Sequence, residues 1–415
     1  MSKNIIVIGG GVIGLCSAYY LRKHGHHVTV LDQSSMDEGA SYVNAGYLSP
    51  SHIIPLSAPG VMRKGIRWMF DTSSPLYIKP RLNSDLIRWG LAFNKSCNQK
   101  HVERSIPVIR DISVLSQELY DEIKADQGFS FHYEKKGLMM LCQTQKAMDE
   151  EIKIANLARE VDLDVSILNP SEIKKLEPSA EIDAIGGTYF LCDFHTTPHE
   201  FMNDMKKGLP EMGVEIRKNS EVLDLEVNGK EINAVITSEE RMSCDEVVMA
   251  AGSWTGLLGR KLGLKILMQA GKGYRINTEK DYGITLPAIL SEKKIAVTPM
   301  NGFTRIAGTM EIAGINSSIN KVRVNAIADG VKHYYPKLLI SDDEKKDAAC
   351  GLRPVTPDGL PYIGRSEKCD NLTIAAGHAM MGWSMATATG KLVQETIDEK
   401  KPSIDMHLFN PDRKF

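Results

Sequence analysis

Residues 4–14 of this chain read Asn4-Ile5-Ile6-Val7-Ile8-Gly9-Gly10-Gly11-Val12-Ile13-Gly14. The first five form a short run of mostly β-branched residues, which is typical of a buried parallel strand. A helical spacing of apolar residues follows over 12–24 and ends at Gly25, a favourable residue just past a helix. The next apolar run, 28–31, ends at Asp32. Together these segments predict a strand–helix–strand unit of the usual length, about 30 residues.

The glycines at the first turn of this unit have separate physical roles. Gly9 permits a tight turn, Gly11 lets the backbone approach a pyrophosphate, and Gly14 lets helix and strand pack closely. The start of the helix adds unpaired N–H groups and a positive partial charge. Asp32, which lies 18 residues past Gly14, suits the hydroxyls of a ribose. The turn in this context predicts a dinucleotide site formed by Gly9, Gly11, Val12, Ile13, Gly14, Asp32 and Gln33.

Three later segments favour FAD over NAD, and Asp32 disfavours the 2′-phosphate of NADP. Segment 39–46 follows the second strand, where backbone and polar side chains can reach the phosphates and the flavin ring. Segment 245–254 is a strand that runs into small residues. Segment 377–383 is a glycine turn before a helix, whose N–H groups suit the flavin carbonyl that becomes negative on reduction. We expect further FAD contacts from Ser41, Asn44, Ala45, Gly46, Val222, Ala251, Gly252, Trp254, Gly351, Gly377, His378, Met380, Met381, Gly382 and Trp383.

The composition is that of an ordinary globular protein without a nucleic-acid partner. Of 415 residues, 42% are hydrophobic and 25% are charged, and 50 basic side chains nearly balance 52 acidic ones. The seven cysteines contain no Cys-x-x-Cys pair, which argues against a disulfide framework and a zinc site and fits a reducing cytoplasm. No apolar run is long enough to span a membrane, and the early first strand leaves no room for a signal peptide. We expect a cytoplasmic protein without a metal, and contact with the inner face of the cell membrane stays open.

Strands that would complete the first sheet recur far along the chain, at 246–249 and 372–375. The nucleotide-binding domain is therefore expected to be discontinuous, with a second domain inserted as two stretches. The predicted class is α/β. It comprises a Rossmann-type FAD-binding domain in three pieces (1–82, 191–268 and 346–415) and a mixed-sheet α+β substrate domain in two (83–190 and 269–345).

The segments between these strands contain helices and one long loop. Helices are predicted over 84–126, over 145–161 and from Thr197, where Thr197 and Glu200 would form a capping box. The stretch 39–81 is irregular and rich in Gly, Pro and Ser. A loop of this length in a compact protein usually has a function. This loop contains Tyr42, Tyr47 and His52, which are placed to cap a pocket.

Several of these motifs, in this order, resemble those of a known family. The segments are 7–32, 41–46, 49–50, 58–60, 271–274, 351–359 and 377–383, so that the resemblance covers nearly the whole chain. The chain resembles the D-amino-acid oxidase superfamily of FAD enzymes, and within it the bacterial D-amino-acid dehydrogenase small-subunit type. D-Proline and hydroxyproline dehydrogenases look similar and are not separated by these motifs.

The resemblance implies a fold and a reaction. A Rossmann-type FAD domain would be joined to a mixed sheet that covers the flavin and forms the substrate pocket. A hydride would pass from Cα of a D-amino acid to flavin N5, and water would hydrolyse the imino acid to a 2-oxo acid and ammonia. The electrons would leave to a quinone, an electron-transfer protein or O₂. Two alternatives stay open: a glycine- or sarcosine-type amine oxidase that uses O₂, and a flavin-carrying subunit of a hetero-oligomeric dehydrogenase.

Three side chains are candidates for the substrate site. A guanidinium binds a carboxylate through two parallel hydrogen bonds, and Arg353 matches the carboxylate-binding arginine of the family's Gly-x-Arg-Pro segment. The alternative for Arg353 is a structural ion pair. Tyr274 is expected either to help hold the carboxylate or to pack. Arg305, on a strand of alternating polarity, faces either the pocket or solvent.

Two further residues invite a catalytic role that we do not assign. Hydride transfer needs no strong base when the amine is already neutral, so His378 is expected to contact the flavin and not to abstract a proton. Cys350 lies beside the Gly351–Pro354 segment, in a region where sarcosine-oxidase-like relatives attach flavin covalently. A buried free thiol is the preferred interpretation of Cys350.

Overall fold

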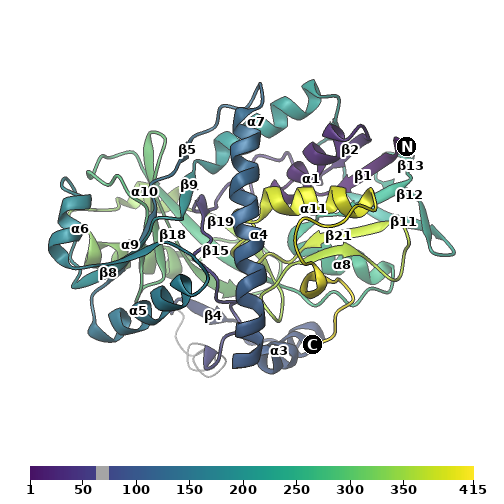
Figure 1. The fold of residues 1–415 in the computed structure, drawn as a ribbon. Coiled ribbons are helices and arrows are strands. Elements are labelled where there is room, and N and C mark those ends of the chain that lie inside the picture. Colours follow the sequence, from purple (N-terminus) through teal and green to yellow (C-terminus); the bar gives the residue numbers. More distant parts are fainter. Residues whose placement is uncertain (62–73) are drawn as a thin grey trace.

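Two large sheets make up most of the molecule, and the long helix α4 (Gln99–Ala125) runs between the two lobes that they form (Figure 1). The computed structural model describes residues 1–61 and 74–415. The predicted irregular stretch 39–81 therefore falls partly on residues 62–73, which lie outside the described residues.

The first sheet carries the strand–helix–strand unit predicted from the N-terminal motif. β1 (Asn4–Ile8) ends at the glycine turn, α1 (Val12–Lys23) follows, and β2 (His27–Leu31) ends just before Asp32. β1 lies between β2 and β14 and runs parallel to both, which confirms the predicted Rossmann-type α/β fold. In order across the sheet the strands are β10 (Glu215–Arg217), β2, β1, β14 (Glu246–Met249), β21 (Leu372–Ala376) and β20 (Tyr362–Arg365).

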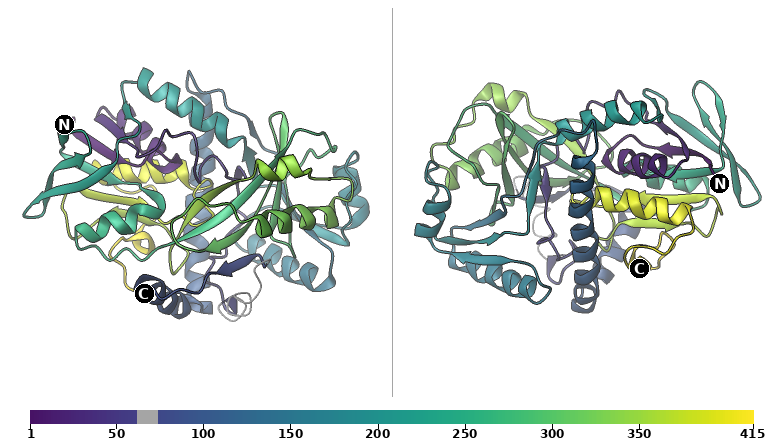
Figure 2. Two further views of the ribbon diagram at one scale, coloured as in Figure 1. Left: turned by 180° about the vertical axis from the view of Figure 1, so that it is seen from behind. Right: turned by 45° about the horizontal axis from the view of Figure 1, so that its top comes forward.

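Helices cover one face of this sheet, and a small sheet covers the other. α11 (Ala386–Ile397) lies beside α1, as Figures 1 and 2 show, and α4 and α7 (Pro198–Glu211) add apolar side chains to the same core. The approach of α11 to α1 depends on Gly390, since a Cβ there would stand 2.5 Å from the carbonyl of Cys16. The opposite face packs against β11 (Val222–Asn228), β12 (Glu231–Thr237), β13 (Arg241–Ser243) and α8 (Thr255–Lys261).

The second sheet is mixed and has nine strands. One face packs against α9 (Lys321–Tyr334), and α5 (Gln145–Arg159) lies on the other face at one end of the sheet. The rest of that second face is free to line a cavity. Across the sheet the strands are β19 (Ala349–Val355), β15 (Gln269–Thr278), β18 (Phe303–Ile312), β17 (Ile295–Met300), β16 (Ala288–Leu290), β6 (Leu138–Cys142), β8 (Gly186–Phe190) and β7 (Val165–Leu168), with β4 (Leu76–Ile78) beside β18.

Smaller elements join the two lobes. A three-stranded sheet links β3 and β5 through β9. The remaining bounds are β3 (Tyr47–Leu48), β5 (Tyr133–Glu134), β9 (Phe194–Thr196), α3 (Ser84–Ser96), α6 (Pro170–Leu176), α10 (Asp342–Lys346), and the 3₁₀ helices η1 (Gly252–Trp254) and η2 (His407–Phe409).

Strand pairing places two strands in another sheet than the predicted domain boundaries do. β19 pairs with β15, and β4 pairs with β18, so both strands belong to the second sheet although the boundaries place 346–415 and 1–82 in the FAD-binding part. α4 contributes to both lobes, since Ile109 and Ile112 pack in the core of the first sheet while Val102 and Ile106 pack beside α5 in a core of the second. These placements are set by contacts distant in sequence, which local patterns do not report.

The mostly helical stretch 84–126 is confirmed as two helices, whereas the capping box predicted at Thr197 was wrong. The stretch is divided, because the Asn98 side chain accepts a hydrogen bond from His101 N–H and starts a new helix. Thr197 does begin α7, but without a capping box. Its hydroxyl bonds His132 Nδ1 at 2.9 Å, and the carboxylate of Glu200 accepts from the N–H of His132 at 2.7 Å. Both side chains thus tie α7 to the neighbouring chain segment.

Candidate active site

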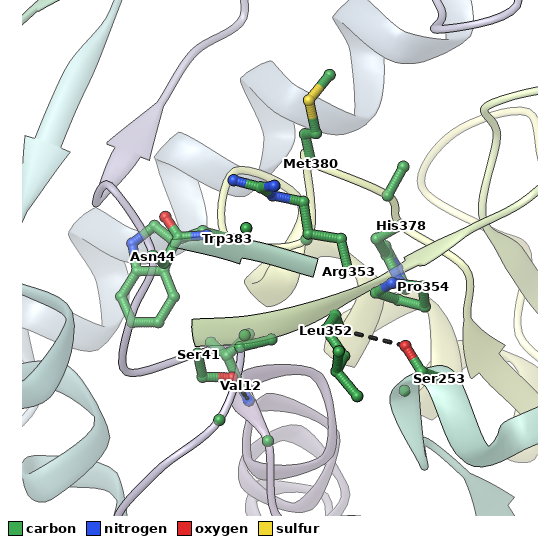
Figure 3. A pocket seen from close by; sticks show the side chains of 18 of the residues that line it. Val12, Ser41, Asn44, Ser253, Leu352, Arg353, Pro354, His378, Met380 and Trp383 are labelled. Carbon is green, nitrogen blue, oxygen red and sulfur yellow. Dashed lines mark hydrogen bonds between the residues drawn. The ribbon is translucent and has the colours of Figure 1, made fainter. Parts of the chain in front are cut away.

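A large cavity of about 1280 Å³ lies where the first sheet meets the open face of the second (Figure 3). It begins at the carboxyl ends of β1, β14 and β21, the position at which open α/β sheets bind nucleotides. Ordinary ligand pockets measure about 300–1,000 Å³, so this one has room for a dinucleotide and a small substrate. The residues that were predicted from sequence and that line it are Gly9, Gly11, Val12, Ile13, Asp32, Gln33, Ser41, Asn44, Ala45, Val222, Ala251, Gly252, Trp254, Gly351, His378, Met380, Met381, Gly382, Trp383, Tyr274 and Arg353.

The N-terminal turn provides an open cradle at one end of the cavity. A Cβ added to Gly11 would meet only the hydroxyl of Ser41, 3.4 Å away, and would otherwise project into the space that a pyrophosphate needs. Ser41 Oγ accepts a hydrogen bond from Val12 N–H at 3.0 Å, which fixes the 39–46 loop against the start of α1. Helix N-termini favour anions through their free N–H groups and their dipole. The turn therefore fits the diphosphate of FAD.

Asp32 joins the second strand to the same turn. Its Oδ2 accepts from Gly10 N–H at 2.7 Å, and its Oδ1 accepts from the backbone N–H and the hydroxyl of Ser34. A carboxylate has about four acceptor sites, and three are occupied here, so one lone pair on Oδ2 remains for a ribose hydroxyl. The geometry agrees with the predicted role of Asp32.

Three of the predicted cofactor residues lie behind the residues that line the cavity. Gly14 is needed for packing, because a Cβ there would lie 1.8 Å from the carbonyl oxygen of Gly9. Gly46 has φ +79° and would meet Thr196 O at 2.2 Å, and Gly377 has φ +84° and would meet Thr356 Cγ2 at 2.5 Å. These glycines shape the backbone that lines the cavity and do not themselves line it.

The turn after β21 presents a neutral histidine. Burial lowers the pKa of His378 to about 3, and its Nε2 bonds Thr389 Oγ1 at 2.9 Å. Trp383 is buried and donates from Nε1 to Thr196 Oγ1, which anchors the other end of the turn. Thr389 Oγ1 donates onward to the carbonyl of Met385, so it accepts the Nε2 hydrogen of His378, and this hydrogen bond leads to no carboxylate that could take up a proton. This agrees with the expectation that His378 does not act as a base, and its contact with the flavin stays a prediction.

Arg353 brings an uncompensated positive charge to the cavity. Its Nη1 donates to the carbonyl of Thr309 at 2.8 Å, and none of the described carboxylates forms an ion pair with it. Burial lowers the pKa of Arg353 to about 10, so that the guanidinium still carries its charge at neutral pH. A half-buried cation without a counter-ion is costly unless an anion binds to it. The structural ion pair considered as an alternative is not formed with any described residue.

The Arg353 side chain depends on a glycine in the neighbouring strand. A Cβ on Gly273 of β15 would lie 2.1 Å from Nη1 and 2.4 Å from Cζ of Arg353. The guanidinium is thus laid across the backbone of β15, with Thr309 of β18 accepting its hydrogen bond. Thr309 has φ +61°, a conformation rare for a β-branched residue, and sequence reasoning missed it because no local signal marks such a position.

Replacing Gly273 with alanine tests this arrangement. The backbone of Gly273 does not need positive φ, so the new methyl group should displace the guanidinium and leave the strand in place. A misplacement of about 1 Å in a positioning group can cost about 10²-fold in rate. We expect KM for the substrate to rise about 10- to 100-fold while FAD content stays at the wild-type level. An unchanged KM would show that the position of Arg353 does not matter.

Tyr274 lines the cavity, but its hydroxyl is directed elsewhere. The O–H donates to Glu311 Oε2 at 2.7 Å, and burial together with this bond raises the pKa of Tyr274. Glu311 also lies 4.0 Å from the buried ammonium of Lys272. Because the hydroxyl hydrogen is engaged in this bond to Glu311, Tyr274 has no O–H left to donate to a substrate carboxylate. The packing alternative therefore describes Tyr274 better than the carboxylate role does.

Arg305 is in neither of the two expected places. It is buried and does not line the cavity. Its Nη1 donates to the carbonyls of Tyr42 and Asn44 at 2.8 and 2.7 Å, and its Nε donates to Asn277. Burial lowers the pKa of Arg305 to about 9. It holds the 42–44 loop against the second sheet, so it acts on the cofactor site through the backbone.

Three remaining features concern the Cys350 thiol, metal ions and the membrane. Cys350 is a free thiol as expected, but it is only partly buried and lines the cavity; it donates to Ser317 O at 3.4 Å, and desolvation raises its pKa. Among residues 1–61 and 74–415, no three His, Cys, Asp or Glu side chains come together as a metal site. No helix in these two stretches combines the length and hydropathy that crossing a membrane requires.

Comparison with known proteins agrees with this geometry. The family model DAO, described as FAD dependent oxidoreductase, matches residues 4–396. A D-amino acid dehydrogenase of Helicobacter pylori (strain J99) is 30% identical over 99% of both chains, and one of Vibrio atlanticus is 29% identical over 98% of this chain and 99% of the relative.

Solved structures share the fold. A glycine oxidase from Geobacillus kaustophilus superimposes with a TM-score of 0.78 at 21% identity, covering 100% of this chain and 99% of that one. An L-proline dehydrogenase from P. horikoshii gives 0.76 at 20% identity, covering 99% and 97%.

Proposed function

Because the chain belongs to the DAO family of FAD dependent oxidoreductases, we propose that it oxidises D-amino acids at Cα and passes the electrons to an acceptor other than O₂. The relatives named D-amino acid dehydrogenase support this proposal, since they match the chain from end to end. FAD is the cofactor of the family. When bound, it supplies the acceptor for the hydride that leaves Cα.

Residues of both sheets would hold the cofactor. The Gly9–Gly14 turn and Ser41 would bind the diphosphate, and Asp32 would bind the ribose. The 378–383 turn would lie against the flavin. These assignments follow from the cavity lining and from the open cradle at Gly11.

The observation that carries the proposal is the unpaired guanidinium of Arg353. An amino acid brings a carboxylate of fixed geometry, which a planar guanidinium binds through two hydrogen bonds. One hydrogen bond to Thr309 O orients the guanidinium and leaves its other N–H groups free for a ligand. Holding the carboxylate at one point lets the cavity wall orient Cα toward the flavin. The imino acid released from the site would then hydrolyse to a 2-oxo acid and ammonia.

A substrate panel tests the proposal. The purified holoenzyme is assayed with D- and L-amino acids, D-proline, cis-4-hydroxy-D-proline, glycine and sarcosine, first with a dye or short-chain quinone and then with O₂ alone. We expect 2-oxo acid from D-isomers with the dye or quinone and little peroxide with O₂. Peroxide formed in a stoichiometric amount would show that the enzyme is an oxidase and not a dehydrogenase. Turnover of L-isomers alone would overturn the proposed specificity for D-amino acids.

A further inference from the structure

A buried carboxylate lies behind the part of the cavity wall formed by loop residues 49–58. Asp193, in the turn between β8 and β9, is fully buried, and no described cation forms an ion pair with it. Its Oδ1 accepts from Ser51 N–H at 3.1 Å, and its Oδ2 accepts from Ser51 Oγ at 2.5 Å. Ser51 and His52 both line the cavity that Arg353 lines. A chain of hydrogen bonds therefore leads from the cavity to Asp193.

The direction of these bonds assigns the tautomer of His52. Since the Ser51 hydroxyl donates to Asp193, its oxygen is free to accept, and His52 Nδ1 lies 3.1 Å from it. Nδ1 therefore carries the hydrogen, and Nε2 keeps its lone pair. No described residue bonds Nε2, so it is available to a ligand in the cavity.

We propose that His52, Ser51 and Asp193 form a proton relay that takes the ammonium proton of the bound amino acid. The inference rests on the proposed function. The N–H bond of the ammonium breaks and a bond to His52 Nε2 forms; Nδ1 gives its proton to Ser51 Oγ, and Ser51 gives its proton to Asp193 Oδ2. No electrons are transferred. The products are a neutral amine, a neutral His52 of the other tautomer and a protonated Asp193.

The reaction needs such a step because an ammonium nitrogen has no lone pair to assist loss of hydride from Cα. Burial raises the pKa of Asp193 to about 7, so this carboxyl takes up a proton near neutrality. Burial, with the charge of Lys294, lowers the pKa of His52 to about 4, so the ring passes a proton on without retaining it. A base with a pKa near the working pH is the most effective one.

Other titratable groups face the relay without competing with it. Cys192 Sγ lies 3.6 Å from Asp193 Oδ1, and burial raises the pKa of that thiol. Tyr47 donates its hydroxyl to the carbonyls of Ala288 and Val297, and burial raises its pKa as well. The negative charge of Asp164 raises the pKa of Cys192 further. Both the thiol and the phenol stay protonated through the neutral range, so the titration near pH 7 belongs to Asp193.

The Asp193→Asn variant distinguishes a proton relay from a structural cap, by which we mean that Asp193 only holds Ser51 in place through its two hydrogen bonds. The amide oxygen can still accept from Ser51 N–H, but the NH₂ group now faces Ser51 Oγ as a donor. The hydroxyl must then turn toward His52 Nδ1, which reverses the tautomer and places a hydrogen on Nε2. We expect kcat/KM at pH 7 to fall about 10²-fold or more and to recover as pH approaches the pKa of the substrate amine. In the wild type, kcat/KM should rise with pH through about 7, because the relay needs ionised Asp193.

Two further variants distinguish loss of the relay from loss of the folded structure. Ser51→Ala breaks the relay and should give the same alkaline recovery. Ser57→Ala is the matched control, since Ser57 is a buried hydroxyl of the same loop that donates to Asp358 O at 2.7 Å and lies outside the relay. It should keep the wild-type pH profile. FAD absorbance and thermal unfolding show that each variant is folded.

Infrared difference titration supplies a readout independent of turnover. A carboxylic-acid band with a midpoint near pH 7 should be present in the wild type and in Ser57→Ala, and absent in Asp193→Asn. Asp193→Asn and Ser51→Ala profiles that match Ser57→Ala would overturn the relay and leave Asp193 as a cap. If the enzyme oxidises no D-amino acid, the proposed function itself is contradicted, whatever the infrared titration shows.

Discussion

Arg353→Met is expected to lower kcat/KM for D-amino acids by about 30- to 5,000-fold. Truncating one partner of a buried charge pair typically costs about 2–5 kcal/mol, and each 1.4 kcal/mol is about tenfold. The loss should appear mainly in KM, because the guanidinium binds a carboxylate that the reaction does not alter. FAD content should not change, since Arg353 makes its described hydrogen bond to Thr309 and not to the dinucleotide cradle. Steady-state kinetics and flavin absorbance measure the two quantities.

The thermal stability of the Arg353→Met variant should not fall with its activity. Methionine removes a half-buried charge without a described counter-ion, so the thermal midpoint should stay the same or rise. Arg353→Lys keeps the charge but loses the planar fork and should give an intermediate KM. Kinetics within about threefold of wild type for Arg353→Met, where tenfold corresponds to 1.4 kcal/mol, would remove Arg353 from the substrate site.

Gly14→Ala is expected to produce the largest loss of cofactor. The new Cβ would lie 1.8 Å from the Gly9 carbonyl oxygen, which is backbone and cannot move as a side-chain end can. The turn must open, and overpacking of this kind costs about 1–3 kcal/mol. If the cost falls on binding, FAD affinity drops by about ten- to hundredfold. Flavin-to-protein absorbance ratios after purification, and titration with added FAD, measure the change.

Gly90→Ala serves as the matched control for that substitution. Gly90 lies in helix α3, does not adopt positive φ, and leaves open space where the methyl group of an alanine would stand, with no neighbouring atom within 4 Å. Alanine in a helix is favoured over glycine by about 1 kcal/mol, so stability should rise slightly and FAD content should not change. Equal FAD content in the two variants would contradict the role of Gly14 in holding the turn.

Much of the first sheet was predictable from the sequence because its signals are local. Strand β1, the glycine turn, helix α1 and Asp32 follow one another within one short segment, and each has a residue pattern of its own. The glycine segments near 252 and 377 likewise mark the turns where the later strands end. Local pattern and final structure agree here because the nucleotide site is built from strand ends and turns.

The second sheet was less predictable because its features depend on distant partners. Arg305 lies on an alternating strand, but its guanidinium is taken by the carbonyls of Tyr42 and Asn44, more than two hundred residues away in the chain. Tyr274 is likewise held by Glu311. The link between Ser51 and Asp193 crosses 142 positions and has no motif to reveal it. Sequence patterns report which face a residue occupies and not which partner it meets there.

Anaerobic mixing of the holoenzyme with D-amino acids tests the central claim most directly. With O₂ and artificial acceptors removed, the visible flavin absorbance should be lost on adding a D-isomer and retained on adding its L-isomer. The Arg353→Met enzyme should need a far higher concentration of the same D-isomer for half-maximal bleaching. A wild-type flavin that keeps its colour with every D-amino acid tested, D-proline included, would contradict the account.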